Sequence, residues 1–196
     1  MNILTVSHYF NSNGAGVEIV AGLIRAQLQK RGCNVRWLAA RVDNGVSYSY
    51  PPDKDCVAIP MWDGIRAATD LAWPIPPPSS FGEFHREVEH ADIIHLHEPF
   101  YPACQMAFWL AMLSHKPLVI TQHIADMPVA GFMRRNAVTL ANLLLTRPAH
   151  RLAKSVVFVS ERSRRLFYTS AKGKDALIYN GCDTFLLHCV KDAERE

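Results

Sequence analysis

The residues of this 196-residue sequence that could carry chemistry gather in a few short segments. The first is the loop Asn11–Glu18, in which Gly14, Ala15 and Gly16 precede a helical pattern. Small residues ahead of a helix let backbone N–H groups approach a phosphate closely, and the positive end of the helix favours its charge. The loop therefore indicates an anion site, although a structural turn without a ligand could have the same composition.

Histidines form the second group. His95 and His97 alternate along an expected strand, so both side chains share a face where they could bind one metal ion. No third or fourth ligand stands at a recognisable spacing, which favours one buried histidine and one at the strand end, and no metal. His123 directly follows another expected strand, where it could hydrogen-bond a substrate hydroxyl or phosphate, or move a proton. A structural histidine is the alternative at that position.

Short apolar segments that alternate with helical patterns must position these residues. Seven strands are expected at 3–7, 35–40, 57–60, 92–96, 117–121, 156–159 and 176–179. The residues that follow them in the chain include His8, His97, His123, Ser160 and Asn180. Helical spacing is expected at 17–31 with Gly32 ending that helix, and at 81–90, 104–113, 136–152 with a kink at Pro148, and 163–168. The proline-rich stretch 73–78 is expected to be an ordered surface connection. The alternation predicts an α/β, Rossmann-like parallel sheet with helices on both faces, whose ligands lie beyond the carboxyl ends of the strands.

The composition is that of a globular domain, with 49% hydrophobic and 20% charged residues. The start of the chain has no basic segment and no long apolar stretch, and no run of about 18 apolar residues occurs elsewhere. The five cysteines are odd in number and lack CxxC spacing, which favours reduced thiols. We therefore expect a cytoplasmic protein.

Charge is spread unevenly along the chain. Residues 131–174 contain ten Lys and Arg residues and one acidic residue, Glu161, whereas residues 1–130 contain nine basic and twelve acidic residues. So basic a segment predicts an anionic partner, such as a phosphate, a lipid headgroup or a nucleic acid. A solvated helix face is the alternative.

Two familiar nucleotide-binding motifs fit the first loop poorly. A dinucleotide fingerprint needs a third small residue where Ile19 stands, although Asp43 could imitate its ribose-binding acid. A P-loop needs Gly-Lys-Ser/Thr, which does not follow the loop. A nicotinamide enzyme is therefore the less favoured alternative.

Six segments, taken in order, resemble the N-terminal domain of family-4 glycosyltransferases of GT-B fold. They are Ser7–Phe10, Gly14–Glu18, His95–His97, Thr121–His123, Val157–Glu161 and Tyr179–Asp183. The last resembles the Pro-Asn-Gly-Val-Asp segment that enters the interdomain linker. Two departures from the family pattern occur: Ala15 interrupts the first glycine pair, and Tyr179 replaces the usual proline.

The resemblance implies that residues 1–179 form the acceptor-side half of a two-domain enzyme. Residues 180–196 would begin the linker, and the domain that binds most of the nucleotide sugar through a Glu-x7-Glu motif would be absent, so this chain alone is expected to be inactive. The implied enzyme is a retaining hexosyltransferase of glycan, glycolipid or polysaccharide synthesis that needs neither a metal nor another cofactor. The alternatives are a nicotinamide- or other nucleotide-binding enzyme and a non-catalytic binding module of the same fold.

The resemblance also implies roles for single residues. His123 would contact the transferred sugar as the catalytic residue, and the loop with Gly14, Ala15, Gly16 and Glu18 would face the donor phosphates. The acceptor would be lined by Tyr9, His97, Glu98 and Asp126, and the interdomain cleft by Ser160 and Asn180. The implied partners are a nucleotide sugar, a sugar or lipid-linked sugar acceptor and, for the basic segment, an anionic membrane at its inner face; no nucleic acid is expected.

Overall fold

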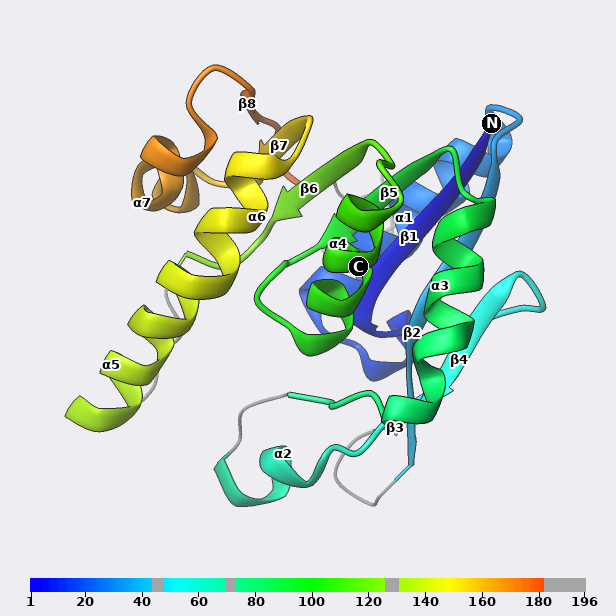
Figure 1. Ribbon diagram of the computed structural model, residues 1–196, viewed down its shortest axis with the longest axis horizontal. Coiled ribbons are helices and arrows are strands. Elements are labelled where there is room, and N and C mark those ends of the chain that lie inside the picture. The colour runs from blue at the N-terminus through cyan, green and yellow to red at the C-terminus, as the bar shows by residue number, and fades with distance from the viewer. Residues whose placement is uncertain (44–47, 70–72, 126–130, 182–196) are drawn as a thin grey trace, which may run out of the picture.

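The computed structural model describes residues 1–43, 48–69, 73–125 and 131–181, and is an α/β domain built on one sheet (Figure 1). Seven strands run parallel in the order β4–β2–β1–β5–β6–β7–β8, and β3 pairs antiparallel with the far end of β2. The strands are β1 (Asn2–Tyr9), β2 (Asn34–Asp43), β3 (Tyr48–Ser49), β4 (Cys56–Pro60), β5 (Ile93–His97), β6 (Leu118–Gln122), β7 (Ser155–Phe158) and β8 (Asp175–Leu177). The seven expected strands are confirmed. The two-residue strand β3 was not expected, because it is too short to carry a periodic pattern.

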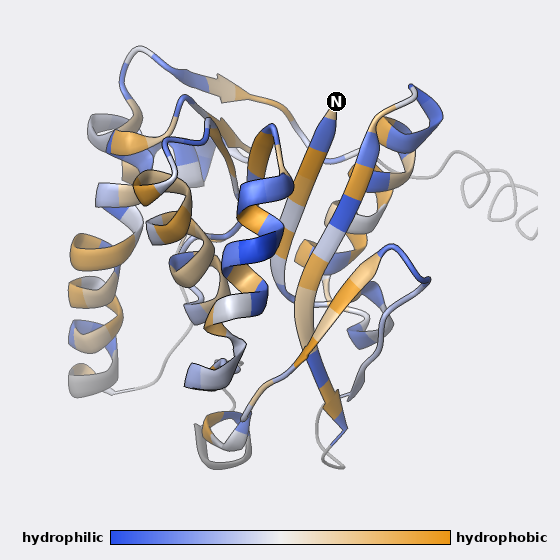
Figure 2. Ribbon diagram, turned by 45° about the vertical axis from the view of Figure 1, so that its right-hand side comes forward, coloured by the Kyte–Doolittle hydropathy of each residue, from blue (hydrophilic) through white to orange (hydrophobic). Residues whose placement is uncertain are grey.

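Both faces of the sheet carry helices, as the fold class requires (Figure 1). One face is covered by α3 (Phe81–His90), α4 (Pro102–Leu113), α6 (Arg147–Leu152) and α7 (Glu161–Ala171), of which α7 packs on β7 and β8 and beside α6. In the described part of the chain, α1 (Gly16–Lys30) is the helix that packs on the opposite face, against β1 and β2. Figure 2 shows apolar residues along the central strands.

The larger core lies between the strands and the helices α3, α4, α6 and α7. Leu96, Ile120 and Phe158 have no exposed surface and pack with Phe84 of α3 and Phe108 of α4. Because side chains alternate along a strand, the residues between them face the other way, toward α1. The core on that side is small: Phe10, Ala21, Trp37 and Ala39.

The chain reverses its direction across the sheet between β1 and β5. From β1 it moves outward through β2 and β4, and it then crosses back to β5 on the other side of β1. Parallel pairing of β1 with β5, and of β5 with β6, brings their carboxyl ends to one edge. In open α/β sheets such a switch point is where ligands bind.

The helix observed in the region predicted as 136–152 differs from the prediction in its start and in its irregularity. It begins at α5 (Phe132–Ala141) and continues through a π-helical turn, η3 (Asn142–Thr146), into α6. The predicted kink at Pro148 was therefore misplaced, since the irregularity precedes the proline. Proline has no N–H and its ring clashes with the carbonyl four residues earlier, so the wider turn before it relieves that clash.

Other local expectations are confirmed or extended. Gly32 has φ 82° just after α1, as expected for a glycine that ends a helix. Ile75 in the proline-rich connection exchanges backbone hydrogen bonds with Trp62, at 2.8 and 3.0 Å, so the connection is ordered. The helix α2 (Gly64–Thr69) was not expected. Within the described ranges, every helix is too short or too polar to cross a bilayer.

Candidate active site

The glycine-containing loop ends at the N-terminus of α1. Gly14 has φ 78°, a conformation that side chains disfavour, and Ala15 is the N-cap residue, which offers no side-chain acceptor. A Cβ added to Gly14 or Gly16 would meet no atom within 4 Å, so space is open beside both residues. The first turn of α1 thus presents backbone N–H groups without a capping side chain, an arrangement suited to binding an anion.

The first turn of α1 also carries a buried carboxylate. Glu18 has no exposed surface, and its Oε1 lies 2.8 Å from Nε2 of His8, at the end of β1. The His8 ring stacks on Tyr101, with ring centroids 3.7 Å apart. The second carboxylate oxygen of Glu18 has no hydrogen-bond partner among the described residues. A buried charge with so few partners is costly, which marks this position as different from the ordinary core.

Three histidines meet where β5 and β6 end. The rings of His95 and His97 lie on one face of β5, with centroids 4.3 Å apart, as predicted. His95 Nε2 lies 2.8 Å from the hydroxyl of Thr121, and His97 Nδ1 lies 3.1 Å from His123 Nε2. Burial lowers the pKa of His95 and of His123 to about 4 and that of His97 well below its usual value, so all three are neutral at physiological pH.

His123 is close to the charges at the start of α1. Burial lowers the pKa of His123, and His95 and His8 lower it further, whereas Glu18 raises it. Residues from the ends of β1, β5 and β6 and from the first turn of α1 therefore share one site. His123 is partly exposed, unlike His97, which is fully buried.

Glu98 fixes the backbone around His123. It is a non-glycine residue with φ 65°, 1% exposed, directly after β5. One carboxylate oxygen accepts from Nε2 of Gln122 at 2.6 Å, and the other accepts from the backbone N–H groups of His123 and Ile124, at 3.1 and 2.8 Å. Burial raises its pKa to about 7, against the effect of these three donors. A strained backbone held by three hydrogen bonds is typical of a functional loop.

A buried polar chain continues from Glu98 to the helices. Gln122 Oε1 lies 2.9 Å from His150 Nε2 on α6, and His150 Nδ1 lies 3.2 Å from the hydroxyl of Ser170 on α7. Neither Gln122 nor His150 was predicted as a site residue. The one available signal was the position of Gln122, beside His123 at a strand end.

Other predicted site residues make contacts inside the protein or lie apart. Tyr9 is fully buried, and its hydroxyl donates to Asp63 at 2.5 Å. Ser160 caps α7 by accepting from the N–H of Ser163 at 3.2 Å. Asn180 lines a groove of about 710 Å³ between α1 and strands β5–β7. Asp126 lies outside the described residues.

Acceptor contacts by Tyr9, His97 and Glu98 stay predictions. Each of the three side chains is buried and has at least one hydrogen-bond partner within the protein. Among the described residues, no group of three or more histidine, cysteine, aspartate or glutamate side chains has an arrangement suited to a metal ion.

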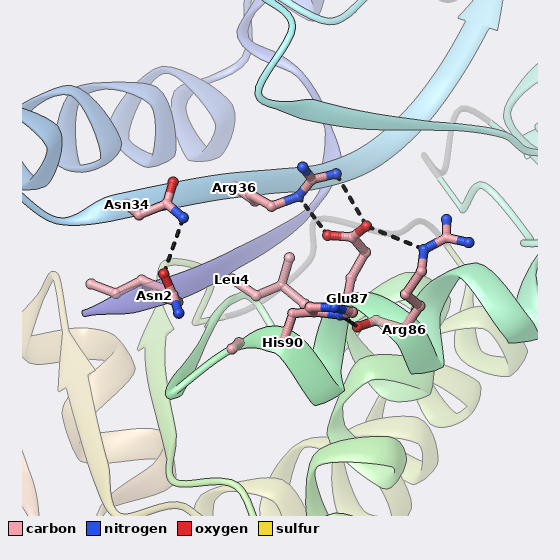
Figure 3. A pocket seen from close by; sticks show the side chains of 9 residues that line it. Asn2, Leu4, Asn34, Arg36, Arg86, Glu87 and His90 are labelled. Carbon is pink, nitrogen blue, oxygen red and sulfur yellow. Dashed lines mark hydrogen bonds and ion pairs between the residues drawn. The ribbon is translucent and has the colours of Figure 1, made fainter.

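A second pocket lies at the opposite end of the sheet (Figure 3). It has a volume of about 430 Å³ and is lined by residues that begin β1 and β2 and by α3. Its polar groups are matched: Arg36 donates twice to Glu87, at 2.6 and 3.1 Å, and the side chains of Asn34 and Asn2 are hydrogen-bonded at 3.0 Å. Ligands of open α/β sheets bind at the other end of the strands, so this pocket is the weaker candidate.

Several solved structures that share this fold are glycosyltransferases, and a UDP-GlcNAc 2-epimerase from Methanocaldococcus jannaschii also shares it, with a TM-score of 0.52 and 10% identity. A MurG structure from Acinetobacter baumannii matches with a TM-score of 0.52 and 16% identity, over 93% of this chain and 46% of that one. An α-glucosyltransferase in complex with UDP and DNA matches with a TM-score of 0.57 and 13% identity, over 97% and 43%. A sucrose-phosphate synthase chain from Thermosynechococcus elongatus matches with a TM-score of 0.54 and 15% identity, over 100% and 98%. These likenesses define the fold as one half of the GT-B architecture.

The family follows from the sequence itself. The family model for Glycosyltransferase Family 4 matches residues 14–185, and the chain belongs to that family. A search of curated proteins gave no significant match. The chain spans about half the length of the MurG and α-glucosyltransferase chains that it matches.

Proposed function

We propose that this chain is the acceptor-side half of a retaining hexosyltransferase that uses a nucleotide sugar. The observation that carries the proposal is the site at the switch point, where His123 lies near the uncapped first turn of α1. Family membership supports sugar transfer. Among similar folds, the α-glucosyltransferase was solved with UDP and a starch synthase IV with ADP and acarbose, which is consistent with nucleotide sugars as donors.

Each part of the site has a defined task in this proposal. The N–H groups of Gly16 and the following residues face the leaving diphosphate and stabilise the charge that develops on it, which is electrostatic stabilisation by preorganised donors. His123 contacts the transferred sugar as a neutral imidazole. Glu98 and His97 hold His123 in place. No metal ion is needed, because the helix N-terminus and cations of a second domain would balance the diphosphate.

The nucleotide is bound mainly by a second domain, which would follow Asn180 and the linker 180–196. Ser160 and Asn180 would face the cleft between the two domains. This part of the proposal rests on the length of the similar chains, about twice that of the region matched.

The acceptor is a sugar or a lipid-linked sugar at the cytoplasmic face of a membrane. The helix formed by α5, η3 and α6 exposes the large apolar residues Phe132, Leu140, Leu143 and Leu144, each more than half exposed. Arg135, Arg147 and Arg151 lie on the same helix. Apolar side chains beside cations are suited to the headgroup region of an anionic bilayer. A basic helix face that is only solvated is the alternative.

A matched pair of glycine variants tests the proposal in the full-length enzyme. Both Gly16→Ala and Gly82→Ala place a Cβ in open space, so both should fold normally. In Gly16→Ala the new methyl group stands where the diphosphate would approach, and KM for the nucleotide sugar should rise roughly 10-fold, about 1.4 kcal/mol of binding. Gly82→Ala on α3 should behave as the wild type.

The assay also tests the reaction itself. Product from an α-linked nucleotide sugar should keep the α configuration, as read by NMR. Inversion would contradict the retaining mechanism. A full-length protein that binds nucleotide sugars and acceptor sugars without transfer would favour a non-catalytic binding module.

A further inference from the structure

The hydrogen bond between His97 and His123 joins two neutral imidazoles, so one of the two nitrogens must carry the proton. His97 Nδ1 and His123 Nε2 are 3.1 Å apart. A neutral imidazole has one N–H and one acceptor nitrogen, and the hydrogen bond at one nitrogen decides which form is present. The second nitrogen of His97, Nε2, is buried and has no hydrogen-bond partner among the described residues.

The lack of a partner at His97 Nε2 distinguishes the two possible positions of the shared proton. If His123 donates, His97 accepts at Nδ1 and must carry its own proton at Nε2, which leaves a buried N–H without an acceptor. If His97 donates, its Nε2 is a bare lone pair. Orphaned buried N–H groups are rarer than under-satisfied acceptors, so the second assignment costs less. Neither ring is a charged imidazolium at physiological pH, because burial lowers the pKa of both.

We propose that His97 is a positioning residue that donates from Nδ1 to Nε2 of His123 and thereby fixes His123 in the tautomer with its proton on Nδ1. His123 then faces the site as a neutral hydrogen-bond donor. It cannot accept a proton at Nδ1, so its contact with the sugar is donation to a hydroxyl oxygen or to an oxygen that gains negative charge. This role in transfer rests on the proposed function, whereas the tautomer does not.

Groups other than His97 also act on His123. Glu98 holds its backbone N–H at 3.1 Å, which fixes the residue from the main chain while His97 fixes the ring. Glu18 and His8, from α1 and β1, are the charged or titratable groups that act on it from the other side, with His95 beside His97.

Imidazole ¹⁵N NMR on the 196-residue chain with labelled histidine tests the proposal directly. In the wild type, His123 should show the shift of a protonated nitrogen at Nδ1 and of a bare nitrogen at Nε2. His97→Asn keeps an amide donor at about the position of Nδ1 and should preserve that tautomer. His97→Leu removes the donor, and the Nε2–H form of His123 should then appear. A wild-type His123 with its proton on Nε2 would overturn the proposal even if neither variant folds.

Kinetics of the full-length enzyme give an independent reading. His97→Leu should lower kcat about 10–100-fold, the scale for loss of an orienting partner, with little change in KM for the donor, while His97→Asn should retain most of kcat. An unaltered tautomer in His97→Leu would contradict the proposal. The expected tautomers together with a fully active His123→Ala would instead leave the positioning intact and contradict the proposed function.

Discussion

The two ends of the parallel sheet hold polar clusters of different kinds. At the amino ends of the strands, Arg36 and Glu87 form an ion pair with two hydrogen bonds, and the backbone N–H of Asn2 donates to Asp92 at 2.7 Å. Arg36 is 44% exposed, so water reaches that pair. At the carboxyl ends, Glu18 and His97 are fully buried, and each has a polar atom without a hydrogen-bond partner among the described residues.

We interpret this difference as one between groups that stabilise the fold and groups that serve a ligand in the proposed function. Paired polar groups at the amino ends need nothing further, and their loss should affect folding alone. Buried polar atoms without partners are rare in ordinary cores, because each costs free energy. Several such atoms gather near the uncapped N-terminus of α1, which sets the carboxyl ends apart from the amino ends. The comparison therefore predicts opposite phenotypes for mutations at the two ends.

The largest effect is expected from His123→Ala in the full-length enzyme. Loss of one polar contact in the transition state should lower kcat roughly 10–1000-fold. The side chain is partly exposed and makes one side-chain hydrogen bond, so the melting temperature of the domain should change by only a few degrees, since that bond contributes about 1 kcal/mol. Steady-state kinetics and thermal unfolding measure the two halves. A strongly destabilised but fully active variant would identify a structural histidine.

Arg36→Leu at the opposite end should give the reverse result. It leaves the carboxylate of Glu87, whose side chain is 7% exposed, without its main partner. The free energy of unfolding should fall by about 1–3 kcal/mol, because a nearly buried acceptor loses its donor. Values of kcat and KM should stay at the wild-type level in the folded fraction. A large loss of activity without loss of stability would remove the distinction between the two ends.

As the pH falls, groups at the carboxyl ends of the strands should be the first to lose their contribution to stability. Burial lowers the pKa of His95 to about 4, against 6.5 for the unfolded side chain. The folded ring stays neutral while the unfolded one binds a proton, so its contribution to stability is complete above pH 6.5 and is lost as the pH falls toward 4. His123 acts in the same direction, whereas Glu98, with its pKa raised to about 7, acts in the opposite one.

The variant His95→Asn isolates that contribution. It keeps a polar side chain near Thr121 but does not titrate, so the slope of unfolding free energy against pH should decrease by about 1.4 kcal/mol per pH unit, one proton, in that window. Urea unfolding at several pH values measures the slope. Equal slopes for the variant and the wild type would mean that His95 is not held neutral by burial.

The smallest effect is expected on membrane binding. Leu143→Ser combined with Leu144→Ser removes two exposed apolar side chains from the turn η3, and it should weaken binding to phosphatidylglycerol vesicles several-fold, by about 1–2 kcal/mol. Wild-type binding should also weaken as salt rises, since exposed charges are screened. Equal sedimentation with neutral and anionic vesicles would contradict a basic membrane surface.

Local patterns were sufficient to predict most of the fold. Each of the seven parallel strands contains a short apolar segment, and Gly32, a glycine that follows the helical pattern, marks the end of α1. The misplaced irregularity at Pro148 has a different cause. The sequence locates the missing N–H, but it does not show which turn of the helix adapts to it.

The positions of the candidate site residues in the fold were predictable in outline, and their contacts were not. His123 and Gly16 were located because strand ends and helix starts are visible in the sequence. The pairing of Gln122 with His150 joins residues 28 positions apart and depends on how α6 packs on β6. Glu98 was expected to contact an acceptor, and no local signal could indicate that it accepts hydrogen bonds from the next strand end.

Hydrogen–deuterium exchange of the full-length protein, with and without its nucleotide sugar, tests most directly the claim that substrates bind at the carboxyl ends. The account predicts slower exchange in peptides that contain residues 14–18 and 122–124 when the donor is bound. Peptides that contain Arg36 or Glu87 should exchange at the same rate in both states. Protection around Arg36 and Glu87, with none at residues 14–18 and 122–124, would contradict the account and place the functional site at the amino ends of the strands.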